Sequence, residues 1–143
     1  MKRVLHVEDN GLVTDRIGSQ LREKGYDVKT AYSYESALDR WDENQGKFDC
    51  IILDLHINPA GMNEQDIEKF FPMYGIAAFD YFVENNKSNE DLRLKTIIYS
   101  GYTDQFNKMC SKQGWSLDKI KQIEKTGFSI AELLTAINLI CDV

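Results

Sequence analysis

The feature that most constrains the fold is a run of four apolar residues, Cys50-Ile51-Ile52-Leu53, that leads directly into Asp54. A short continuous apolar run bounded by polar residues is typical of a strand buried on both faces, as in a parallel sheet. A polar residue that directly follows such a strand lies at the edge of the sheet where open α/β folds bind their ligands. The run therefore predicts a parallel sheet and makes Asp54 a candidate functional residue.

Four further segments have strand-like patterns, and stretches with helical spacing of apolar residues separate them. The expected strands comprise residues 4–7, 26–30, 96–99 and 119–125. The expected helices lie near residues 13–21, 37–41, 104–113 and 129–141. Because strand and helix alternate along the chain, we expect a parallel sheet with helices on both faces, joined by right-handed crossovers. The fold class is therefore α/β and doubly wound.

The stretch between Asp54 and the next strand is too long for one loop and one helix. Residues 67–71 contain the apolar positions of a short extra helix, and Pro72 would end it. Residues 76–83 have the apolar spacing of a longer helix, which we interpret as the crossover helix. An insertion after the third strand is therefore expected at about residues 58–74.

The last helix has the clearest sequence signature. Apolar residues recur at helical spacing between residues 130 and 141. Ser129 and Glu132 have the spacing of a capping box, in which the side chain of each accepts a hydrogen bond from the backbone of the other. We therefore expect the Ser129 side chain to cap the first turn of this helix.

Five polar residues follow the predicted strands and therefore share one edge of the sheet. They are Glu8, Asp9, Asp54, Ser100 and Lys125. Three carboxylates this close repel one another unless a cation neutralises them. Magnesium accepts carboxylate oxygens and often bridges to a phosphoryl group. An aspartate can form an acyl phosphate, and a lysine can neutralise a phosphoryl oxygen. The edge is thus a candidate magnesium and phosphoryl site.

Taken in order, four sequence segments resemble the receiver domain of two-component response regulators. They are Val7-Glu8-Asp9-Asn10, the apolar run into Asp54, Ile98-Tyr99-Ser100-Gly101 and Glu124-Lys125. The resemblance implies a flavodoxin-like, five-stranded parallel sheet of order 2-1-3-4-5, with an expanded loop or extra helix after strand 3. It also implies that residues 1–143 form a single receiver domain, with the insertion at about residues 58–74.

The same resemblance implies roles for the polar residues. Asp54 would accept a phosphoryl group from a histidine kinase or a histidine phosphotransfer protein in a magnesium-dependent reaction. Ser100 would shift towards the phosphoryl group, and Lys125 would pair with it. The ligands of Mg²⁺ would be Glu8, Asp9, Asp54 and the backbone carbonyl of His56. The resemblance implies no enzymatic activity other than magnesium-dependent self-phosphorylation and autodephosphorylation.

Two positions depart from the receiver pattern. Gln122 stands where receivers usually carry an aromatic switch residue, and Thr126 stands where a proline usually follows the lysine. Tyr102 is a candidate for a substitute aromatic. The departures leave a second possibility, a receiver-like interaction module that acts without phosphorylation.

Two other classes of protein are disfavoured. An aspartyl phosphatase would typically carry a second carboxylate two residues after the nucleophile, where this chain has His56. A flavodoxin-like cofactor binder would need a phosphate-binding loop after the first strand, and no Gly-rich or Ser/Thr-rich loop follows it.

The composition restricts where the chain acts and what it binds. The net charge of −6 disfavours direct nucleic-acid binding. No apolar segment is long enough for a membrane span or a signal peptide, so we expect a cytoplasmic protein without membrane contact. The three cysteines are far apart and odd in number, so we expect reduced and mostly buried thiols.

The end of the chain suggests a stand-alone receiver, because the last helix closes the domain near Val143. Such a receiver would signal by contact with an unknown downstream protein. Phe70 and Phe71 are most simply core residues. If they were exposed, they would form an apolar patch suited to a partner or a homodimer.

Overall fold

The computed structural model describes residues 1–113, 119–126 and 129–142, so Val143 lies outside the described residues. Five parallel strands form one sheet in the order β2-β1-β3-β4-β5, which confirms the predicted fold class. The strands are β1 (Arg3–Val7), β2 (Asp27–Ala31), β3 (Cys50–Leu53), β4 (Thr96–Ser100) and β5 (Lys121–Glu124). In the register of the sheet, Val7 pairs with Ala31 on one side and with Leu53 on the other.

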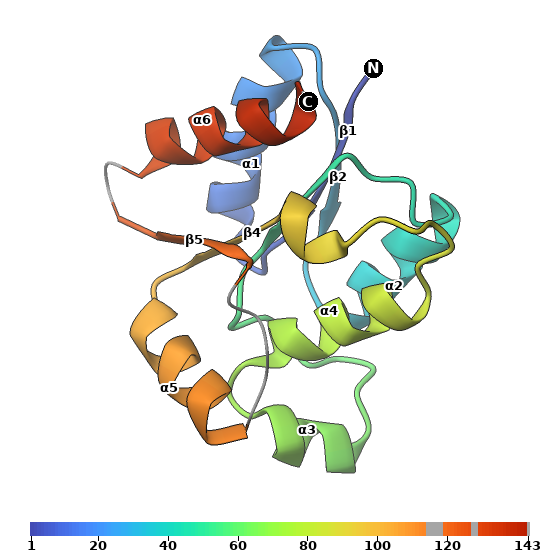
Figure 1. Cartoon of the computed structure of the whole chain (residues 1–143), viewed down its shortest axis with the longest axis vertical. Coiled ribbons are helices and arrows are strands. Elements are labelled where there is room, and N and C mark those ends of the chain that lie inside the picture. Colours follow the sequence, from blue (N-terminus) through green and yellow to red (C-terminus); the bar gives the residue numbers. More distant parts are fainter. Residues whose placement is uncertain (114–118, 127–128, 143) are drawn as a thin grey trace.

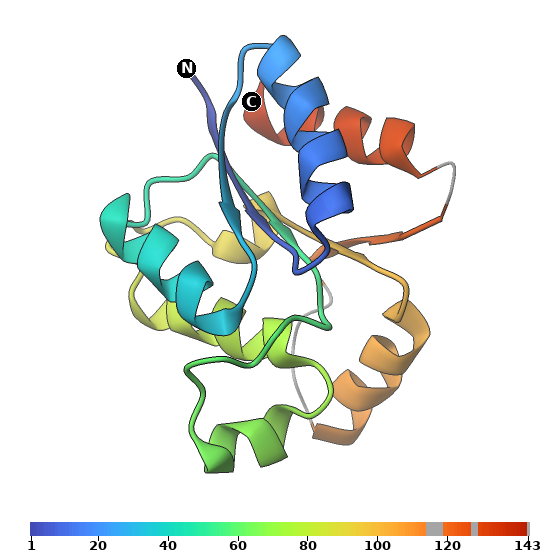
Figure 2. The same ribbon diagram turned by 180° about the vertical axis from the view of Figure 1, so that it is seen from behind.

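Helices cover both faces of the sheet (Figures 1 and 2). They are α1 (Gly11–Glu23), α2 (Tyr34–Glu43), α3 (Glu64–Phe70), α4 (Tyr74–Glu84), the short 3₁₀ helix η1 (Leu92–Lys95), α5 (Thr103–Gln113) and α6 (Ile130–Cys141). Helices α1 and α6 lie together on one face, and α2, α4 and α5 lie on the other. The chain is therefore doubly wound, as the alternation of strands and helices predicted.

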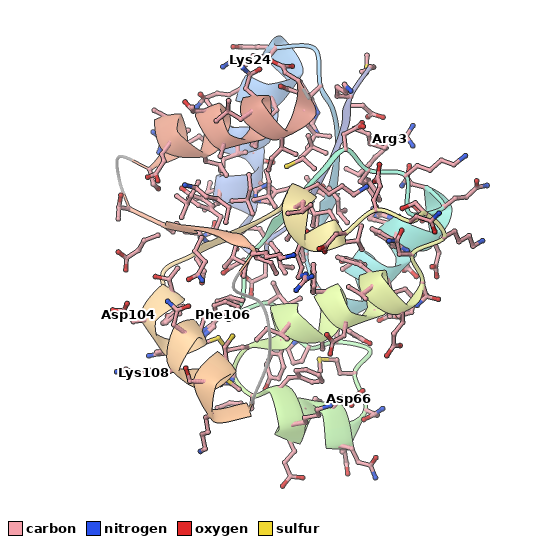
Figure 3. All side chains as sticks on the ribbon, viewed as in Figure 1. Arg3, Lys24, Asp66, Asp104, Phe106 and Lys108 are labelled. Atoms are coloured by element: carbon pink, nitrogen blue, oxygen red, sulfur yellow. The ribbon has the colours of Figure 1, made fainter. Side chains whose placement is uncertain are left out.

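The core is divided into two clusters because successive strand residues point to opposite faces. On β3, Ile51 and Leu53 belong to the cluster under α2 and α4, whereas Cys50 and Ile52 belong to the cluster under α1 and α6. Helix α5 contributes a narrow apolar stripe. Its Phe106 points into the molecule and is 1% exposed, while Asp104 and Lys108 point outwards (Figure 3).

The extra helix predicted after the third strand is present as α3, within residues 58–74. The loop before it is held to α2, because the amide of Glu35 donates a hydrogen bond of 2.9 Å to the carbonyl of Ala60. Phe70 at the end of α3 is buried in the core, and its neighbour Phe71 is 65% exposed. The prediction that both phenylalanines are core residues is therefore right for Phe70 and wrong for Phe71. Phe71 follows the last residue of α3, where the backbone leaves the helical conformation, and its ring lies outside the core.

The capping box predicted at Ser129 is not formed. Ser129 lies before the first residue of α6, but its side chain makes no capping hydrogen bond. Its Oγ instead accepts a 3.0 Å hydrogen bond from the amide of Thr126 and bonds with the hydroxyl of Tyr99 at 2.8 Å. A buried hydroxyl on a neighbouring strand therefore competes with the helix terminus for this side chain. Among the described residues, no helix is long and apolar enough to cross a membrane.

Candidate functional site

Glu8, Asp9 and Asp54 converge at the carboxyl edge of the sheet. One carboxylate oxygen of each lies within 4.8 Å of those of the other two. The backbone extends the strand pairing at this point, because the amide of Asp54 donates to the carbonyl of Val7 at 2.9 Å and the amide of Glu8 donates to Ala31 at 2.9 Å. Glu8 and Asp54 are 1% and 6% exposed, and Asp9 is open to solvent. The cluster is thus rigidly placed and reachable from one side.

Lys125 enters this cluster from the end of β5. Its Nζ donates a hydrogen bond to Glu8 Oε1 and lies 3.2 Å from Asp54 Oδ2. The Lys125 amide donates to the carbonyl of Ser100 at 2.9 Å, which fixes the start of this loop against β4. The ammonium also lies 5.6 Å from the centroid of the Tyr99 ring, within reach of a cation–π interaction. One cation therefore contacts two of the three carboxylates.

The charges of the cluster do not balance within the protein. Burial, together with the hydrogen bond and the charge of Asp54, raises the pKa of Glu8 to about 8 against the opposing effect of Lys125. Burial lowers the pKa of Lys125, but the charges of Asp54 and Glu8 outweigh it and the net shift is upwards. Three carboxyl groups therefore share one ammonium in a partly buried place, where a bound cation would favour the ionised form of Glu8. Oxygen ligands with excess negative charge are the donor set that Mg²⁺ requires, so the residues fit this ion.

Ser100 ends β4 next to the cluster and is completely buried. Its Oγ accepts a 3.3 Å hydrogen bond from the amide of Tyr102. Strand β4 pairs directly with β3, with Ile98 opposite Leu53, so Ser100 lies on the strand beside Asp54. The structure thus brings all five predicted edge residues to the same edge of the sheet.

His56 and Tyr102 stack on each other at this edge. Their ring centroids lie 3.7 Å apart, and the ring planes differ by 5°. Burial lowers the pKa of His56. Its Nε2 is buried and has no hydrogen-bond partner among the described residues. Sequence reasoning assigned only the backbone carbonyl of His56 to the site, because no local pattern indicates a ring contact with a residue on another loop.

Gly75 is a positioning residue that the sequence did not reveal. It lies in the first turn of α4, and its amide donates a 2.9 Å hydrogen bond to the carbonyl of Leu55. A Cβ atom here would overlap with the backbone oxygen of Asp54 and lie 3.0 Å from Leu55 Cα. Only glycine lets α4 approach the backbone of Asp54 this closely.

The side chain of Gln122 on β5 makes a hydrogen bond to helix α5. Its Nε2 donates a 2.9 Å hydrogen bond to Asn107 Oδ1, which links β5 to α5. The side chain therefore connects two elements through a polar contact, at the position where the receiver pattern has an aromatic ring.

Comparison with known proteins shows which fold the chain shares and which family part of its sequence matches. Residues 4–63 match the family model of the response regulator receiver domain. The non-phosphorylated receiver domain of HemR from Leptospira biflexa is similar in structure, with a TM-score of 0.71 and 20% identity over 100% of this chain and 96% of that chain. The response regulator TrrA from Thermotoga maritima, solved in complex with Mg²⁺ and BeF, has a TM-score of 0.65 and 21% identity over 98% of this chain and 99% of that one.

A CheY-like receiver domain protein from Methanospirillum hungatei has a TM-score of 0.69 and 19% identity over 99% of this chain and 94% of that chain. No curated protein sequence matches the chain. The resemblance to response regulator receiver domains is confirmed, because the chain has the receiver fold and residues 4–63 match the family model. The likeness to this family thus rests on residues 4–63 in sequence and on the fold over the whole chain.

Proposed function

We propose that Asp54 accepts a phosphoryl group from a histidine kinase or a histidine phosphotransfer protein. The observation that carries the proposal is the position of the Asp54 carboxylate, which lies with Glu8 and Asp9 and contacts the Lys125 ammonium. Phosphorylation on aspartate is general for receiver domains. A carboxylate oxygen of Asp54 would form a bond to phosphorus while the bond from phosphorus to the donor's histidine nitrogen breaks.

Magnesium would be held by Glu8, Asp9, Asp54 and the backbone carbonyl of His56, and it would supply positive charge opposite the phosphoryl oxygens. Lys125 can exchange its contact with the Asp54 carboxylate for one with a phosphoryl oxygen, because both are anionic oxygens at the same edge. Ser100 can turn its hydroxyl from the amide of Tyr102 towards the new group. No enzymatic activity beyond magnesium-dependent self-phosphorylation and autodephosphorylation is proposed.

The output of such a receiver would be a contact with another protein. The chain would act as a stand-alone receiver, with the surface of α5, β5 and α6 as the part that responds. Ser100 is the last residue of β4 and Lys125 directly follows β5, so a movement of these two residues is transmitted directly to α5 and α6. Phe71, exposed on the insertion, is a further candidate contact for a downstream protein or a homodimer.

A phosphorylation-independent interaction module is the second candidate. The observation that favours it is the hydrogen bond between Gln122 and Asn107, which replaces an aromatic switch by a fixed polar contact between β5 and α5. Such a module would keep the receiver fold and bind its partner in one state.

The intact mass of the protein after incubation with Mg²⁺ and acetyl phosphate or phosphoramidate separates the two candidates. We expect the gain of one phosphoryl group in the wild type and none in Asp54→Asn or in wild type with EDTA. Asp104→Asn, an exposed carboxylate on α5, is the matched control and should be labelled like wild type. Equal labelling of wild type and Asp54→Asn would refute the assignment of the acceptor. An unlabelled wild type with a magnesium-dependent shift in thermal stability would establish the second candidate instead.

A further inference from the structure

The rings of His56 and Tyr102 join two loops at the carboxyl edge of the sheet. His56 lies on the loop after β3, and Tyr102 lies between the end of β4 and the first residue of α5. The ring centroids are 3.7 Å apart and the ring planes differ by only 5°, so the two rings stack face to face. Because β3 and β4 are paired neighbours, this stack ties the loop that follows Asp54 to the loop that follows Ser100.

The two stacked residues differ in how their backbones are held. The amide of Tyr102 donates a 3.3 Å hydrogen bond to Ser100 Oγ, and its carbonyl accepts a 3.0 Å hydrogen bond from the amide of Phe106. Tyr102 is therefore fixed on both sides. In the part of the chain that the structure describes, no donor bonds to the carbonyl of His56. The stack thus joins a ring on a fixed backbone to a residue whose carbonyl oxygen can accept another bond.

The imidazole of His56 is not placed by a hydrogen bond at Nε2. This atom is buried and has no partner among the described residues. A buried polar atom without a partner is unfavourable, so packing against the Tyr102 ring sets the position of the imidazole. Without that ring, the imidazole would gain by turning towards water, and the backbone of His56 would lose its restraint.

We propose that Tyr102 is a positioning residue for the magnesium site, because its ring holds His56 in the conformation in which the His56 carbonyl binds the cation. The proposal rests on the proposed function, which places this carbonyl among the ligands of Mg²⁺. Groups that contact a metal ligand rather than the metal orient that ligand, and their loss weakens metal binding. A ligand that is ordered before binding also loses less conformational freedom when the cation arrives.

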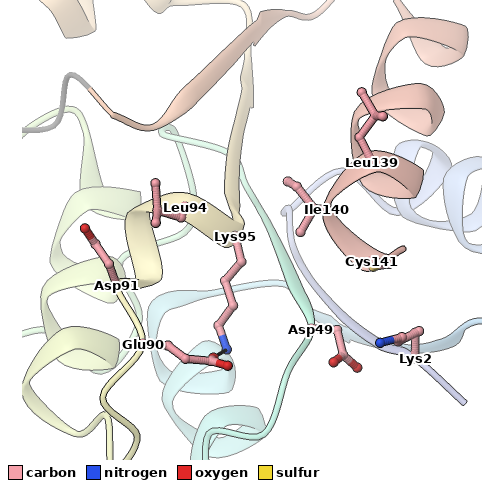
Figure 4. A pocket seen from close by; sticks show the side chains of 9 residues that line it. All are labelled: Lys2, Asp49, Glu90, Asp91, Leu94, Lys95, Leu139, Ile140 and Cys141. Carbon is pink, nitrogen blue, oxygen red and sulfur yellow. Dashed lines mark hydrogen bonds and ion pairs between the residues drawn. The ribbon is translucent and has the colours of Figure 1, made fainter. Parts of the chain in front are cut away.

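Magnesium binding has to be assigned to the carboxyl edge rather than to a second acidic place. A cavity of about 490 Å³ at the amino edge of the sheet is lined by Asp49, Glu90 and Asp91 (Figure 4). Each of these carboxylates already accepts a hydrogen bond from a backbone amide or a cationic side chain. Among the described residues, the only three acidic groups whose ligand atoms converge are those at the carboxyl edge. Glu90→Gln should therefore leave magnesium binding unchanged.

The test is the affinity of the full chain for Mg²⁺ without a phosphoryl donor, measured at one pH from the backbone amide shifts in an NMR titration. We expect Tyr102→Ala to bind Mg²⁺ about tenfold more weakly than wild type. Tyr102→Phe keeps the stacked ring and should bind like wild type. Tyr32→Ala is the matched control, because Tyr32 follows β2 at the same edge and is 47% exposed, against 43% for Tyr102. It should also bind like wild type.

A double-mutant cycle tests whether Tyr102 acts through His56. His56→Ala keeps the backbone carbonyl and removes the stack, so it should weaken Mg²⁺ binding as much as Tyr102→Ala. The double variant should be no weaker than either single variant, since both remove the same contact. Circular dichroism in EDTA shows that the variants are folded. Unchanged affinity in Tyr102→Ala, an equal loss in Tyr102→Phe, or losses that add in the double variant would each overturn the proposal.

A failure of this proposal can be told apart from a failure of the proposed function. If wild type binds Mg²⁺ and gains a phosphoryl group on Asp54 while Tyr102→Ala keeps full affinity, the acceptor assignment stands and the positioning role is wrong. If wild type does not bind Mg²⁺, or if Glu90→Gln loses as much affinity as Asp9→Ala, the magnesium site is misplaced and both proposals fall.

Discussion

The Nζ atom of Lys125 lies 3.2 Å from the Oδ2 atom of Asp54 and also donates a hydrogen bond to Glu8. One side chain that directly follows β5 therefore holds together two carboxylates that follow β1 and β3. In the protein without a divalent cation, this ammonium is the charge that opposes the repulsion between them.

Replacing Lys125 by methionine keeps the length of the side chain and removes its charge. We expect the free energy of unfolding to fall by about 1–3 kcal/mol in EDTA, because two nearly buried carboxylates lose their cation. Magnesium should raise the unfolding midpoint more in this variant than in wild type. Lys121→Met, an exposed lysine on the same strand, is the control and should behave like wild type. Equal magnesium-dependent shifts in Lys125→Met and wild type would contradict the role assigned to Lys125.

Gly75→Ala should destabilise the protein by about 2 kcal/mol or more, because the added Cβ overlaps with the backbone of Asp54 and forces α4 away from the sheet. Chemical denaturation measures the change. Gly11→Ala in the first turn of α1 is the matched control, since its Cβ meets nothing within 4 Å. That variant should be unchanged or up to about 1 kcal/mol more stable. Similar losses in both variants would show that the close approach at Gly75 is not the cause.

The contribution of the insertion to stability can be tested by replacing two adjacent phenylalanines, one buried and one exposed. Phe70→Ala should lower the free energy of unfolding by about 3 kcal/mol, because it leaves a cavity in the core. Phe71→Ala should change it by less than about 0.5 kcal/mol, because that ring is 65% exposed. Urea denaturation of both variants provides the comparison. A small effect of Phe70→Ala would mean that α3 does not belong to the cooperative core.

We expect the contribution of Asp27 to the free energy of unfolding to be lost at acidic pH. The hydrogen bond from Arg3 lowers the pKa of Asp27, so the ionised carboxylate is better stabilised in the folded than in the unfolded chain. This contribution is present above the ordinary pKa of 3.8 and disappears as the pH falls through the lower folded value. Asp27→Asn should therefore be less stable at pH 7 by about 0.5 kcal/mol, the amount typical of a solvent-screened pair.

The difference between Asp27→Asn and wild type should shrink towards zero as the pH is lowered below 3.8. Urea denaturation across this pH range measures it. Arg3→Met removes the same hydrogen bond from the other side and should give the same pH profile. High salt should reduce the difference at neutral pH. A difference that stays constant at all pH values would contradict the ion pair as its source.

The predicted strands and helices were largely right because their signals are local. The run into Asp54 and the run before Ser100 are continuous and apolar, which is the pattern of a parallel strand covered on both faces. The extra helix α3 could also be predicted, because Pro72 and the length of the segment left no simpler interpretation. Ser129 was predicted wrongly as a capping residue, since its true partner Tyr99 comes from another element.

The sequence by itself determined the alternation of strands and helices and, through it, the edge at which Glu8, Asp9 and Asp54 meet. In a parallel sheet, residues at the carboxyl ends of strands must share an edge, so chain order alone implies their proximity. Only the tertiary structure decided that Lys125 bridges Glu8 and Asp54 and that Gly75 touches the Asp54 backbone. These contacts join side chains from different elements, and their geometry follows from how helices pack on the sheet rather than from any local spacing of residues.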